Sequence, residues 1–291
     1  MELRHLRYFI AVAEELHFAR AAERLHIEQS PLSRAIKDLE YDLGVQLFER
    51  TTRSTRLTWA GQVFLDEARR VLSMLEQAKA SAKSAATGYR GTLRIALSDG
   101  VPPPRLVALL AQHREEEPEV EIRLFETTFA QQLKGLSSGL YDAGFAHASE
   151  VGEEIIAEAV WIDPLVIAVP ARHPLLAHKR IPLEELARYP LVLCHPEGCE
   201  GGHRQFERIF RTVDLQPIVA EYITTFDLMM TLVAAGYGLG FANKSHVTVC
   251  NYPEVVIRPL AGRALMLTTY LLRPKVEPSE PLTRFMERAM P

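Results

Sequence analysis

The segment from Gln29 to Lys37 carries side chains that could read a nucleic acid. Its polar members are amide, hydroxyl, guanidinium and ammonium groups, on Gln29, Ser30, Ser33, Arg34 and Lys37. Amides and guanidinium groups bond to base edges in a DNA groove, whereas cations and hydroxyls also contact phosphates. Ser30 followed by Pro31 is typical of an N-cap and a proline at the first helical position. We therefore expect a helix to begin there and to carry these groups.

Apolar residues around this segment predict the elements that hold it. Leu32, Ile36, Leu39 and Leu43 recur at helical spacing and would bury the opposite face of the helix. The preceding helix has an apolar face at Ala21, Ala22 and Leu25, and its small alanines let a second helix cross closely. An earlier helix would complete a three-helix core with Leu3, Leu6, Phe9, Ile10, Ala13 and Leu16. This pattern indicates a helix-turn-helix with a recognition helix.

A strand-like segment with three arginines follows Gly44. Val45, Leu47 and Phe48 predict a strand, and the arginines Arg50, Arg53 and Arg56 are spaced by three among small hydroxyl residues. Such a segment suits a wing lying along a phosphate backbone. The alternative is an ordinary amphipathic helix pair with solvated charges. On the first interpretation the DNA contacts come from Gln29, Ser30, Pro31, Ser33, Arg34, Lys37, Arg50, Arg53 and Arg56.

Residues 1 to about 88 resemble the DNA-binding head and linker helix of a LysR-type transcriptional regulator. The resemblance rests on fixed positions, namely Ala21, Ala22, Leu25, Gln29, Ser30, Ser33, Arg34, Leu39, Glu40, Leu43, Gly44, Leu47, Phe48, Arg50, Leu57, Thr58 and Gly61. The opening ELRHLRYFIAVAEE resembles the subgroup that governs aromatic-compound catabolism. The resemblance implies a winged helix-turn-helix followed by an effector-binding body.

Composition agrees with a chain of two modules. Its 291 residues are about two domains' worth, and 47% hydrophobic residues can fill their cores. No leading apolar run is long enough for a signal peptide or a membrane span, so we expect a cytoplasmic protein with no membrane partner. Up to Arg90 the chain holds 14 Lys and Arg against 12 Asp and Glu, and the remainder holds 19 against 25. Basic character is thus confined to the head, as a site-specific DNA binder with a separate sensing body requires.

A heptad pattern predicts that the linker helix, expected over 58–86, forms an oligomer. Apolar residues recur at alternating steps of four and three, at Phe64, Ala68, Val71, Leu75, Ala78, Ala82 and Ala85. The helix would be roughly 40 Å long at 1.5 Å per residue, too long for a small head to cover. The alternative is that this seam packs on its own chain. A dimer or tetramer would present paired recognition helices to an interrupted dyad in double-stranded DNA.

The remainder of the chain alternates between strands and helices. Strands are expected over 92–97, 120–126, 142–146, 165–169, 191–194, 218–222 and 239–242, and helices over 101–117, 129–140, 182–187, 204–213 and 225–235. Such alternation predicts an α/β body whose parallel sheets are covered on both faces. The resemblance implies two lobes like those of periplasmic solute-binding proteins, with the chain crossing near Asp163 and returning near Leu265. The expected domains are 1–58, a linker at 59–88, lobe I at 91–163 plus 266–291, and lobe II at 164–265.

Small polar residues at the expected helix starts predict an effector site. Ligands of open parallel sheets lie outside the carboxyl ends of the strands, where helix N-termini offer free N–H groups. The segments 98–104, 127–129, 196–203 and 224–227 fit that description. Effector contacts are expected from Ser98, Asp99, Thr128, Phe129, His147, Pro196, Glu197, His203, Thr225 and Phe226, with the backbone at Gly201 and Gly202. The alternative for each serine or threonine is a simple N-cap.

The expected effector is a small anionic or aromatic molecule, and no cofactor or bound metal is expected. Where muconate-responsive relatives carry an arginine, this chain has Ala146 followed by His147, and Asn243 and Lys244 replace a usual proline after the strand that includes Gly240. Both departures argue against a muconate-type effector.

Two other classes of function are alternatives to an effector-responsive regulator. Cys194, His195, Cys199 and His203 cluster, so a thiol switch or a metal sensor of the same fold is an alternative. The second alternative is a solute-binding protein or metabolic enzyme whose N-terminal helices serve only for assembly. No nucleophile elbow, phosphate loop or acid pair occurs, which predicts that the chain is not an enzyme. The favoured interpretation is a regulator that responds by a population shift and has RNA polymerase as a further partner.

Overall fold

The computed structural model describes residues 1–50, 54–86, 88–98, 100, 103–212, 214, 216–249 and 251–290. The chain divides into two compact units, which are described separately. The first unit comprises residues 1–83 with 138–140, and the second comprises 84–137 with 141–291. Arg53 and Asp99, both predicted to contact a ligand, lie outside the described residues.

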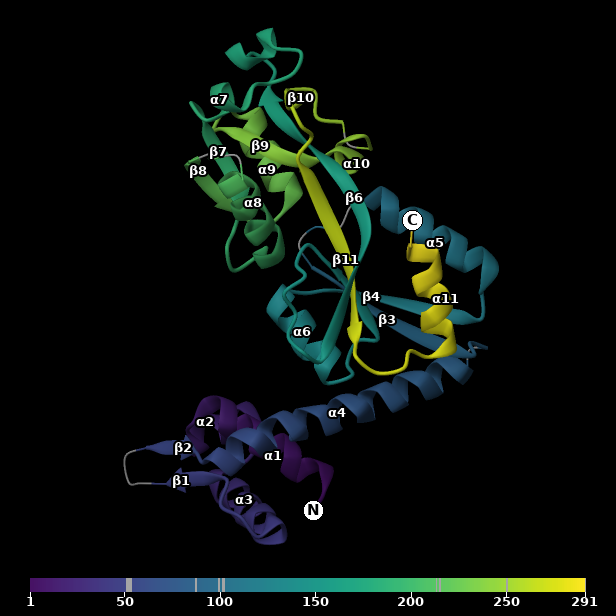
Figure 1. Ribbon diagram of the computed structural model, residues 1–291. Coiled ribbons are helices and arrows are strands. Elements are labelled where there is room, and N and C mark those ends of the chain that lie inside the picture. Colours follow the sequence, from purple (N-terminus) through teal and green to yellow (C-terminus); the bar gives the residue numbers. More distant parts are fainter. Residues whose placement is uncertain are drawn as a thin grey trace. The chain divides into compact units, whose positions relative to one another are not determined.

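The first unit, called the head below, begins with three packed helices (Figure 1). They are α1 (Leu3–Glu15), α2 (Phe18–Arg24) and α3 (Gln29–Leu43). Their shared core confirms the predicted pattern, because it buries Leu6, Phe9, Ala13, Ala21, Ala22, Leu32, Ile36 and Leu39. Leu3 and Leu16, at the two ends of α1, are instead exposed. Alanines at the α2 contact let the helices approach closely, as expected from their size.

Helix α3 begins earlier than its sequence suggested. Its first residue is Gln29 and its N-cap is Glu28, so the prediction that Ser30 caps the helix and Pro31 opens it is wrong. Pro31 is tolerated because N–H groups of a first helical turn have no intrahelical acceptor to lose. At the other end, Gly44 caps α3 with φ of 71°, a left-handed conformation that favours glycine.

The predicted wing is present as a short hairpin. Strands β1 (Phe48–Arg50) and β2 (Thr55–Leu57) pair antiparallel, with Phe48 opposite Leu57 and Glu49 opposite Arg56. Gly61, in the helix that follows, lies against this hairpin. A Cβ there would lie 2.1 Å from the carbonyl oxygen of Leu47, so only glycine allows this close approach.

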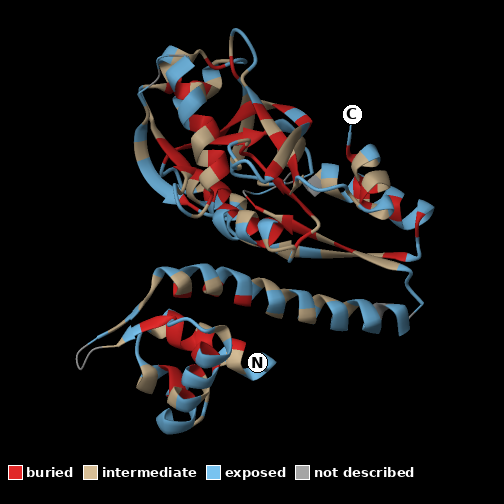
Figure 2. Ribbon diagram, turned by 60° about the horizontal axis from the view of Figure 1, so that its bottom comes forward, coloured by how far each residue is buried: buried red, intermediate tan, exposed pale blue. Residues whose placement is uncertain are grey.

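In the long helix α4 (Trp59–Ala86), the first residues of the predicted heptad seam pack in the core of the head. Phe64 contacts Phe9 with ring centroids 5.1 Å apart, and Ala68 is buried in the head core. For these two residues the prediction of a free dimer seam is therefore wrong, and the alternative of packing on the same chain holds. Burial is confined to the N-terminal half of α4 (Figure 2). Val71, Ala78 and Ala82 are exposed, and Leu75 is half-buried.

The second unit, called the body, is built on one sheet of nine described strands. The order is β4-β3-β5-β11-β6-β9-β7-β8, and β10 pairs with β6 (Figure 1). Their bounds are β3 (Gly91–Leu97), β4 (Val120–Glu126), β5 (Ala143–Ala146), β6 (Ile155–Pro170), β7 (Pro190–Cys194), β8 (Ile218–Ile223), β9 (Leu239–Asn243), β10 (Val255–Pro259) and β11 (Met266–Pro274). The predicted parallel pairing is confirmed for β3 with β4 and β5 and for β7 with β8 and β9. It does not hold for β6, β10 and β11, which run antiparallel to their neighbours.

Strands β6 and β11 connect two halves of the body. We call the half with β3, β4 and β5 the first lobe and the half with β7, β8 and β9 the second lobe. Residues 155–164 of β6 pair with β11, and residues 165–170 pair with β9 and β10. The chain passes from one half to the other close to Asp163, where the family resemblance implied a crossing.

Helices cover both faces of the sheet in each lobe. The first lobe packs α5 (Pro103–Glu116) and α11 (Glu280–Ala289) on one face and α6 (Phe129–Ser137) on the other. The second lobe has α8 (Glu200–Thr212) with α7 (Leu183–Leu186) on one face and α9 (Phe226–Ala234) on the other. A 3₁₀ turn (Pro174–Ala177) and α10 (Lys244–Val247) complete the described elements. Within the described part of the chain, no helix combines the length and apolarity needed to cross a membrane.

Candidate functional site

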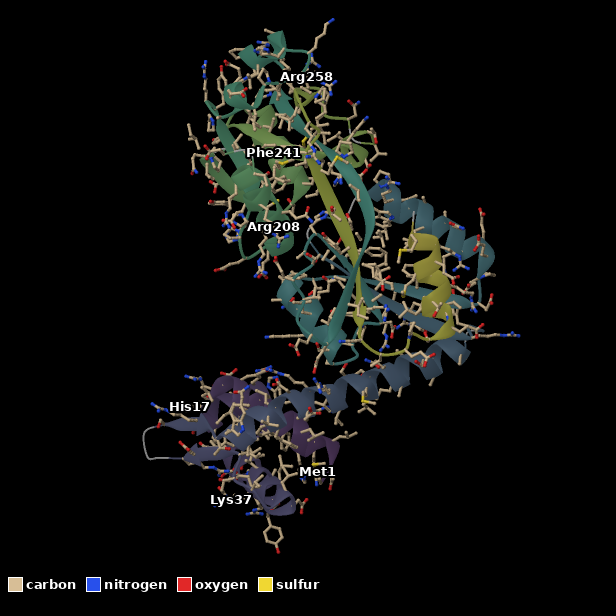
Figure 3. The ribbon with its side chains drawn as sticks, viewed as in Figure 1. Met1, His17, Lys37, Arg208, Phe241 and Arg258 are labelled. Atoms are coloured by element: carbon tan, nitrogen blue, oxygen red, sulfur yellow. The ribbon has the colours of Figure 1, made fainter. Side chains whose placement is uncertain are left out.

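The outer face of α3 gathers the predicted DNA-contacting groups. Gln29, Ser30, Pro31, Arg34 and Lys37 are exposed. Ser33 is half-buried. The opposite face is anchored by Leu32, Ile36 and Leu39, each fully buried, so the polar face is held rigidly outward. Lys37 extends from the surface of this helix in Figure 3.

Ion pairing separates two groups of cations in the head. Most of its arginines and lysines have a carboxylate partner, as in Arg24 with Glu14 at 2.8 Å and Arg69 with Glu14 at 2.7 Å. Within residues 1–50 and 54–82, no ion pair is formed by Arg34, Lys37 or Arg56. These three cations belong to α3 and the wing. Their charge is therefore available to an anionic partner.

Arg50 has a role that its spacing did not reveal. Its Nη2 donates to Oε2 of Glu40 at 2.7 Å, and its guanidinium carbon lies 4.8 Å from the ring centroid of Phe18. The other oxygen of Glu40, a side chain only 4% exposed, accepts hydrogen bonds from the backbone N–H groups of Leu47 (2.9 Å) and Phe48 (3.1 Å). Glu40 and Arg50 thus fasten the wing to α3. Arg50 therefore has a structural role in addition to its predicted phosphate contact, which stays a prediction.

In the first lobe, two of the predicted effector residues are committed to the fold. The Ser98 hydroxyl donates to Oε1 of Gln132 at 2.9 Å, and both residues are buried. Nε2 of Gln132 donates to the carbonyls of Ala96 (2.9 Å) and Phe145 (3.1 Å), which links the ends of β3 and β5. Phe129 is buried in the core, so its prediction as a cleft wall is wrong.

The exposed threonines of both lobes act as helix caps, the simpler of the two interpretations. Thr128 Oγ1 accepts from the N–H of Gln131, and Thr225 Oγ1 accepts from the N–H of Leu228, both at 3.3 Å. Because a hydroxyl oxygen that caps a helix keeps its own O–H to donate, capping leaves each threonine able to bind a ligand.

The loop before α8 is shorter than predicted. Helix α8 begins at Glu200 instead of residue 204, so Gly201 and Gly202 are buried inside its first turn and do not form an open loop. His203 lies within this helix, and its Nδ1 is 2.9 Å from the carbonyl oxygen of Cys194. Pro196 and Glu197 are exposed at the end of β7.

A glutamine that the sequence did not single out connects the lobes. Gln205 of α8 donates through Nε2 to the carbonyls of Thr268 (2.7 Å) and His147, and its Oε1 accepts from the N–H of Thr268 (3.0 Å). His147 itself is buried, with Nδ1 3.2 Å from the Thr268 carbonyl. The end of β5 and helix α8 are thereby joined through β11.

An aromatic pair lies close to this junction. Phe226 stacks on His246 with ring centroids 3.8 Å apart, and the Tyr252 hydroxyl donates to Oδ1 of Asp227 at 2.5 Å. Burial lowers the pKa of His246, and the nearby His147 lowers it further, whereas Asp227 opposes both. His246 is therefore neutral at pH 7 and presents a flat, uncharged ring. Neither Gln205 nor His246 was predicted to have a role, because each is one of several polar residues on its helix.

The cysteine and histidine cluster does not form a metal site among the described residues. Cys194 is half-buried at the end of β7, and Cys199 is buried, with its Sγ 3.2 Å from the carbonyl oxygen of Thr224. Nδ1 of His195 accepts backbone hydrogen bonds from Glu197 (3.2 Å) and Gly198 (3.3 Å), which shapes the turn after β7.

Comparisons with known proteins agree with both units. A family model described as "Bacterial regulatory helix-turn-helix protein, lysR family" matches residues 3–62, and "LysR substrate binding domain" matches residues 86–290. The uncharacterized HTH-type transcriptional regulator YnfL of Escherichia coli (strain K12) is 35% identical over 98% of this chain and 96% of its own length. The HTH-type transcriptional regulator AlsR of Bacillus subtilis (strain 168) is 35% identical over 84% of this chain and 81% of its own.

The fold of the whole chain is similar to solved structures of the same family. Full-length CbnR, solved in complex with its target DNA, has a TM-score of 0.74 and 29% identity, with 99% of both chains covered. These relatives are transcriptional regulators and not enzymes. The chain therefore belongs to the LysR family and is a DNA-binding transcriptional regulator with a helix-turn-helix head and an effector-binding α/β body.

Proposed function

We propose that this regulator reads its DNA target with the exposed face of α3 and contacts the flanking phosphates with the wing. One observation carries the proposal. Arg34, Lys37 and Arg56 have no carboxylate partner among the described residues, whereas every other arginine and lysine described between residues 1 and 79 has one. Arg34 and Gln29 would contact base edges, because guanidinium and amide groups bond bidentately to guanine and adenine. Arg56 and the predicted Arg53 would contact phosphates.

Arg34→Ala is expected to weaken binding to the preferred sequence by about 1 to 3 kcal/mol and to have little effect on random DNA, because it removes a base contact. Arg56→Ala is the matched control and should weaken binding to all sequences while flattening the salt dependence. Mobility-shift titrations on DNA from upstream of the regulator's own reading frame, over a range of salt, measure both. Equal losses on specific and random DNA for Arg34→Ala would contradict the assignment.

The effector would lie between the two lobes, beside Thr128, Thr225, Pro196, Glu197 and His203. Support comes from the two exposed threonine hydroxyls at helix N-termini, which would bind an anionic group of a small molecule. The stacked Phe226 and His246 offer a flat apolar surface for an aromatic ring of the effector. Effector binding would shift the population of lobe arrangements and so alter the spacing of paired heads on DNA. A thiol switch at Cys194 and Cys199 is a second candidate, because Cys194 ends β7 and Cys199 directly precedes α8.

Dimerisation would use the C-terminal part of α4, with Val71, Leu75, Ala78 and Ala82 on the seam. Support comes from the exposure of Val71, Ala78 and Ala82, since Phe64 and Ala68 are the seam residues that pack in the head core among those described. Two heads paired in this way would fit an interrupted dyad in DNA. Dimers would also assemble into a tetramer, and the regulator would contact RNA polymerase. Because DNA is the target, the protein would act inside the cell.

Leu75→Asp should separate the dimer, because two unpaired carboxylates would be desolvated at the seam. Sedimentation velocity measures the change, and the conservative variant Leu75→Met, of similar volume, should keep the native assembly. An unchanged assembly in Leu75→Asp would show that the seam faces another surface.

A further inference from the structure

A pocket of about 560 Å³ lies in the second lobe, between helices α7 and α8 and the segment that joins β10 to β11. Its walls come from the first residue of α7, the last turn of α8 and residues 260–266. The described residues of the proposed effector cleft are not part of this lining. The volume is within the range of small-molecule sites.

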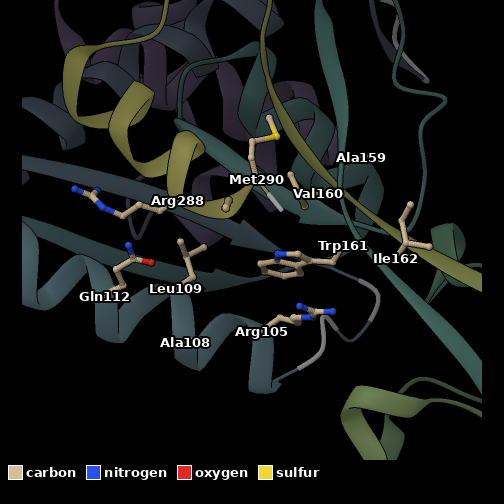
Figure 4. A pocket seen from close by; sticks show the side chains of 11 residues that line it. Arg105, Ala108, Leu109, Gln112, Ala159, Val160, Trp161, Ile162, Arg288 and Met290 are labelled. Carbon is tan, nitrogen blue, oxygen red and sulfur yellow. The ribbon is translucent and has the colours of Figure 1, made fainter.

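The walls of this pocket are aliphatic. Leu183, Ile209 and Leu265 are half-buried and pack against the core of the second lobe, and Leu260 is buried in that core. Alanine and methionine side chains complete the apolar part of the lining, and no aromatic ring belongs to the part of it that the structure describes. The pocket of the first lobe differs, because the indole of Trp161 forms one of its walls (Figure 4). An aliphatic chain therefore suits the second-lobe pocket better than a flat ring, which would find no ring to stack on.

Backbone hydrogen bonds hold the walls in place. The N–H of Ile181, just before α7, donates to the carbonyl of Pro259 at 2.9 Å. The N–H of Ala261 donates in turn to the carbonyl of Ile181 at 2.8 Å. These bonds tie the segment after β10 to the start of α7. The pocket is therefore preformed, and a ligand need not order a loop when it binds.

One cation belongs to this apolar lining. Arg263 is exposed and forms no ion pair among the residues that the structure describes. The hydroxyl of Thr212, which also lines the pocket, donates to the carbonyl of Ile209 at 2.7 Å and has no second proton to donate to a ligand. A guanidinium has five N–H donors, so Arg263 is the side chain that can bind an anionic group here.

We propose that this pocket is a second small-molecule site, which binds a straight-chain aliphatic carboxylate. The chain would fill the space between the leucine and isoleucine walls, and the carboxylate would accept two parallel hydrogen bonds from Arg263. The carbonyl of Leu265 accepts from the N–H of Leu165 at 2.8 Å, and Met266 pairs with Pro164. Both contacts lie where β6 and β11 pass between the lobes, so a ligand packed on Leu265 and Met266 acts on the junction of the two lobes.

Calorimetric titration of the full-length regulator with octanoate tests the proposal, and we expect saturable binding. Hexanoate is shorter by two methylenes and should bind about fifteenfold more weakly, because each buried methylene contributes a factor of about four. Octanamide keeps the chain and lacks the charge. It should bind at least about tenfold more weakly than octanoate, because the charge-assisted hydrogen bonds to the guanidinium are lost.

Two pairs of variants locate the bound molecule. Arg263→Gln should weaken octanoate binding about tenfold or more and have a smaller effect on octanamide. Arg172→Gln, at an exposed arginine of the same lobe, should leave octanoate binding unchanged. Ala264→Phe should fill the pocket and abolish binding, whereas Ala177→Phe, on the 3₁₀ turn of this lobe, should retain it. The four substituted side chains are exposed, so these variants leave the core of the lobe unchanged.

Three results would overturn the proposal. The first is no saturable binding of octanoate up to about 10 mM, ten times the dissociation constant of a 1 mM site. The second is octanoate binding that Arg263→Gln or Ala264→Phe leaves unchanged. The third is loss of binding in Ala108→Phe or in Thr128→Ala, which would place octanoate in the first-lobe pocket or in the proposed effector cleft. Because the readout is binding to the isolated regulator, failure of the proposed DNA contacts would leave this test unaffected.

Discussion

Glu40→Ala should unfold the head while leaving the α/β body folded. The carboxylate is 4% exposed and accepts from the backbone N–H groups of Leu47 and Phe48 and from the Arg50 guanidinium. Its removal leaves two buried N–H donors and one arginine without their acceptor, because alanine can replace none of these bonds. We expect a loss of about 3 to 5 kcal/mol, a large share of the stability of a small unit.

Thermal unfolding followed by circular dichroism would test this, together with a mobility shift on operator DNA. Head and body are separate compact units, so the variant should lower the melting temperature of one transition and abolish specific DNA binding at 37 °C. Glu49→Ala is the matched control, since Glu49 is an exposed wing residue with no ion pair among the described residues. A Glu40→Ala protein that melts and binds like the native one would contradict the anchoring role.

Glu117→Ala should have the converse effect and destabilise the body. Glu117 is 5% exposed at the end of α5, and it accepts from Arg284 and Arg288 of α11, with Nη2 of Arg288 at 2.5 Å. Without it, the buried Arg288 keeps only Glu116 as a carboxylate partner among the described residues, and Arg284 keeps only the exposed Glu280. We expect a loss of about 3 kcal/mol, at the lower end for a broken buried pair because Arg284 is partly exposed.

The ion pairs of Glu117 with Arg284 and Arg288 also predict that the stability of the body depends on pH. Hydrogen bonds, from Arg284 above all, lower the pKa of Glu117 below its ordinary value of 4.5 and outweigh the opposing effect of burial. A depressed folded-state pKa contributes stability that is present above pH 4.5 and is lost as the pH falls through the folded value. Unfolding in urea between pH 7 and pH 3 should show this loss in the native protein and much less of it in Glu117→Gln.

Glu115→Ala is the control for both measurements, because Glu115 lies two residues away on the same helix and is exposed. DNA binding by the head of Glu117→Ala should persist at temperatures below the melting of its body. If Glu117→Ala and Glu115→Ala lost equal stability, the α5 to α11 ion pairs would contribute nothing beyond surface charge.

Local pattern alone was enough to predict most of the head. Fully buried Leu32, Ile36 and Leu39 recur at helical spacing, and burial at that period needs no knowledge of the partner helix. The start of α3 was missed because Ser-Pro is also compatible with the interior of a first turn, where no N–H is needed. The structural role of Arg50 was not predicted, because its partner Glu40 lies ten residues earlier, on a different element.

In the body, the sequence by itself determined the short strands and helices but not how the strands pair. Strand β11 was not predicted, and neither was the first half of β6. These two segments pair antiparallel with each other, β11 with residues 155–164 of β6. Strand direction is set by pairing with distant segments, which hydrophobic periodicity does not encode. Helix α11 was not predicted for the same reason, since its core contacts lie on α5 and β3.

The sequence determined that this protein is a LysR-type DNA binder, because its recognition helix is one continuous segment whose polar groups all project from one face. Only the tertiary structure decided which polar residues are available to ligands. Phe129 and Ser98 looked available and are committed to the core or to a buried partner. Gln205 was not predicted to have a role, and it meets His147 and Thr268 only because α8, β5 and β11 pack together. A ligand site built from distant segments exists only once the hydrophobic core has brought those segments together.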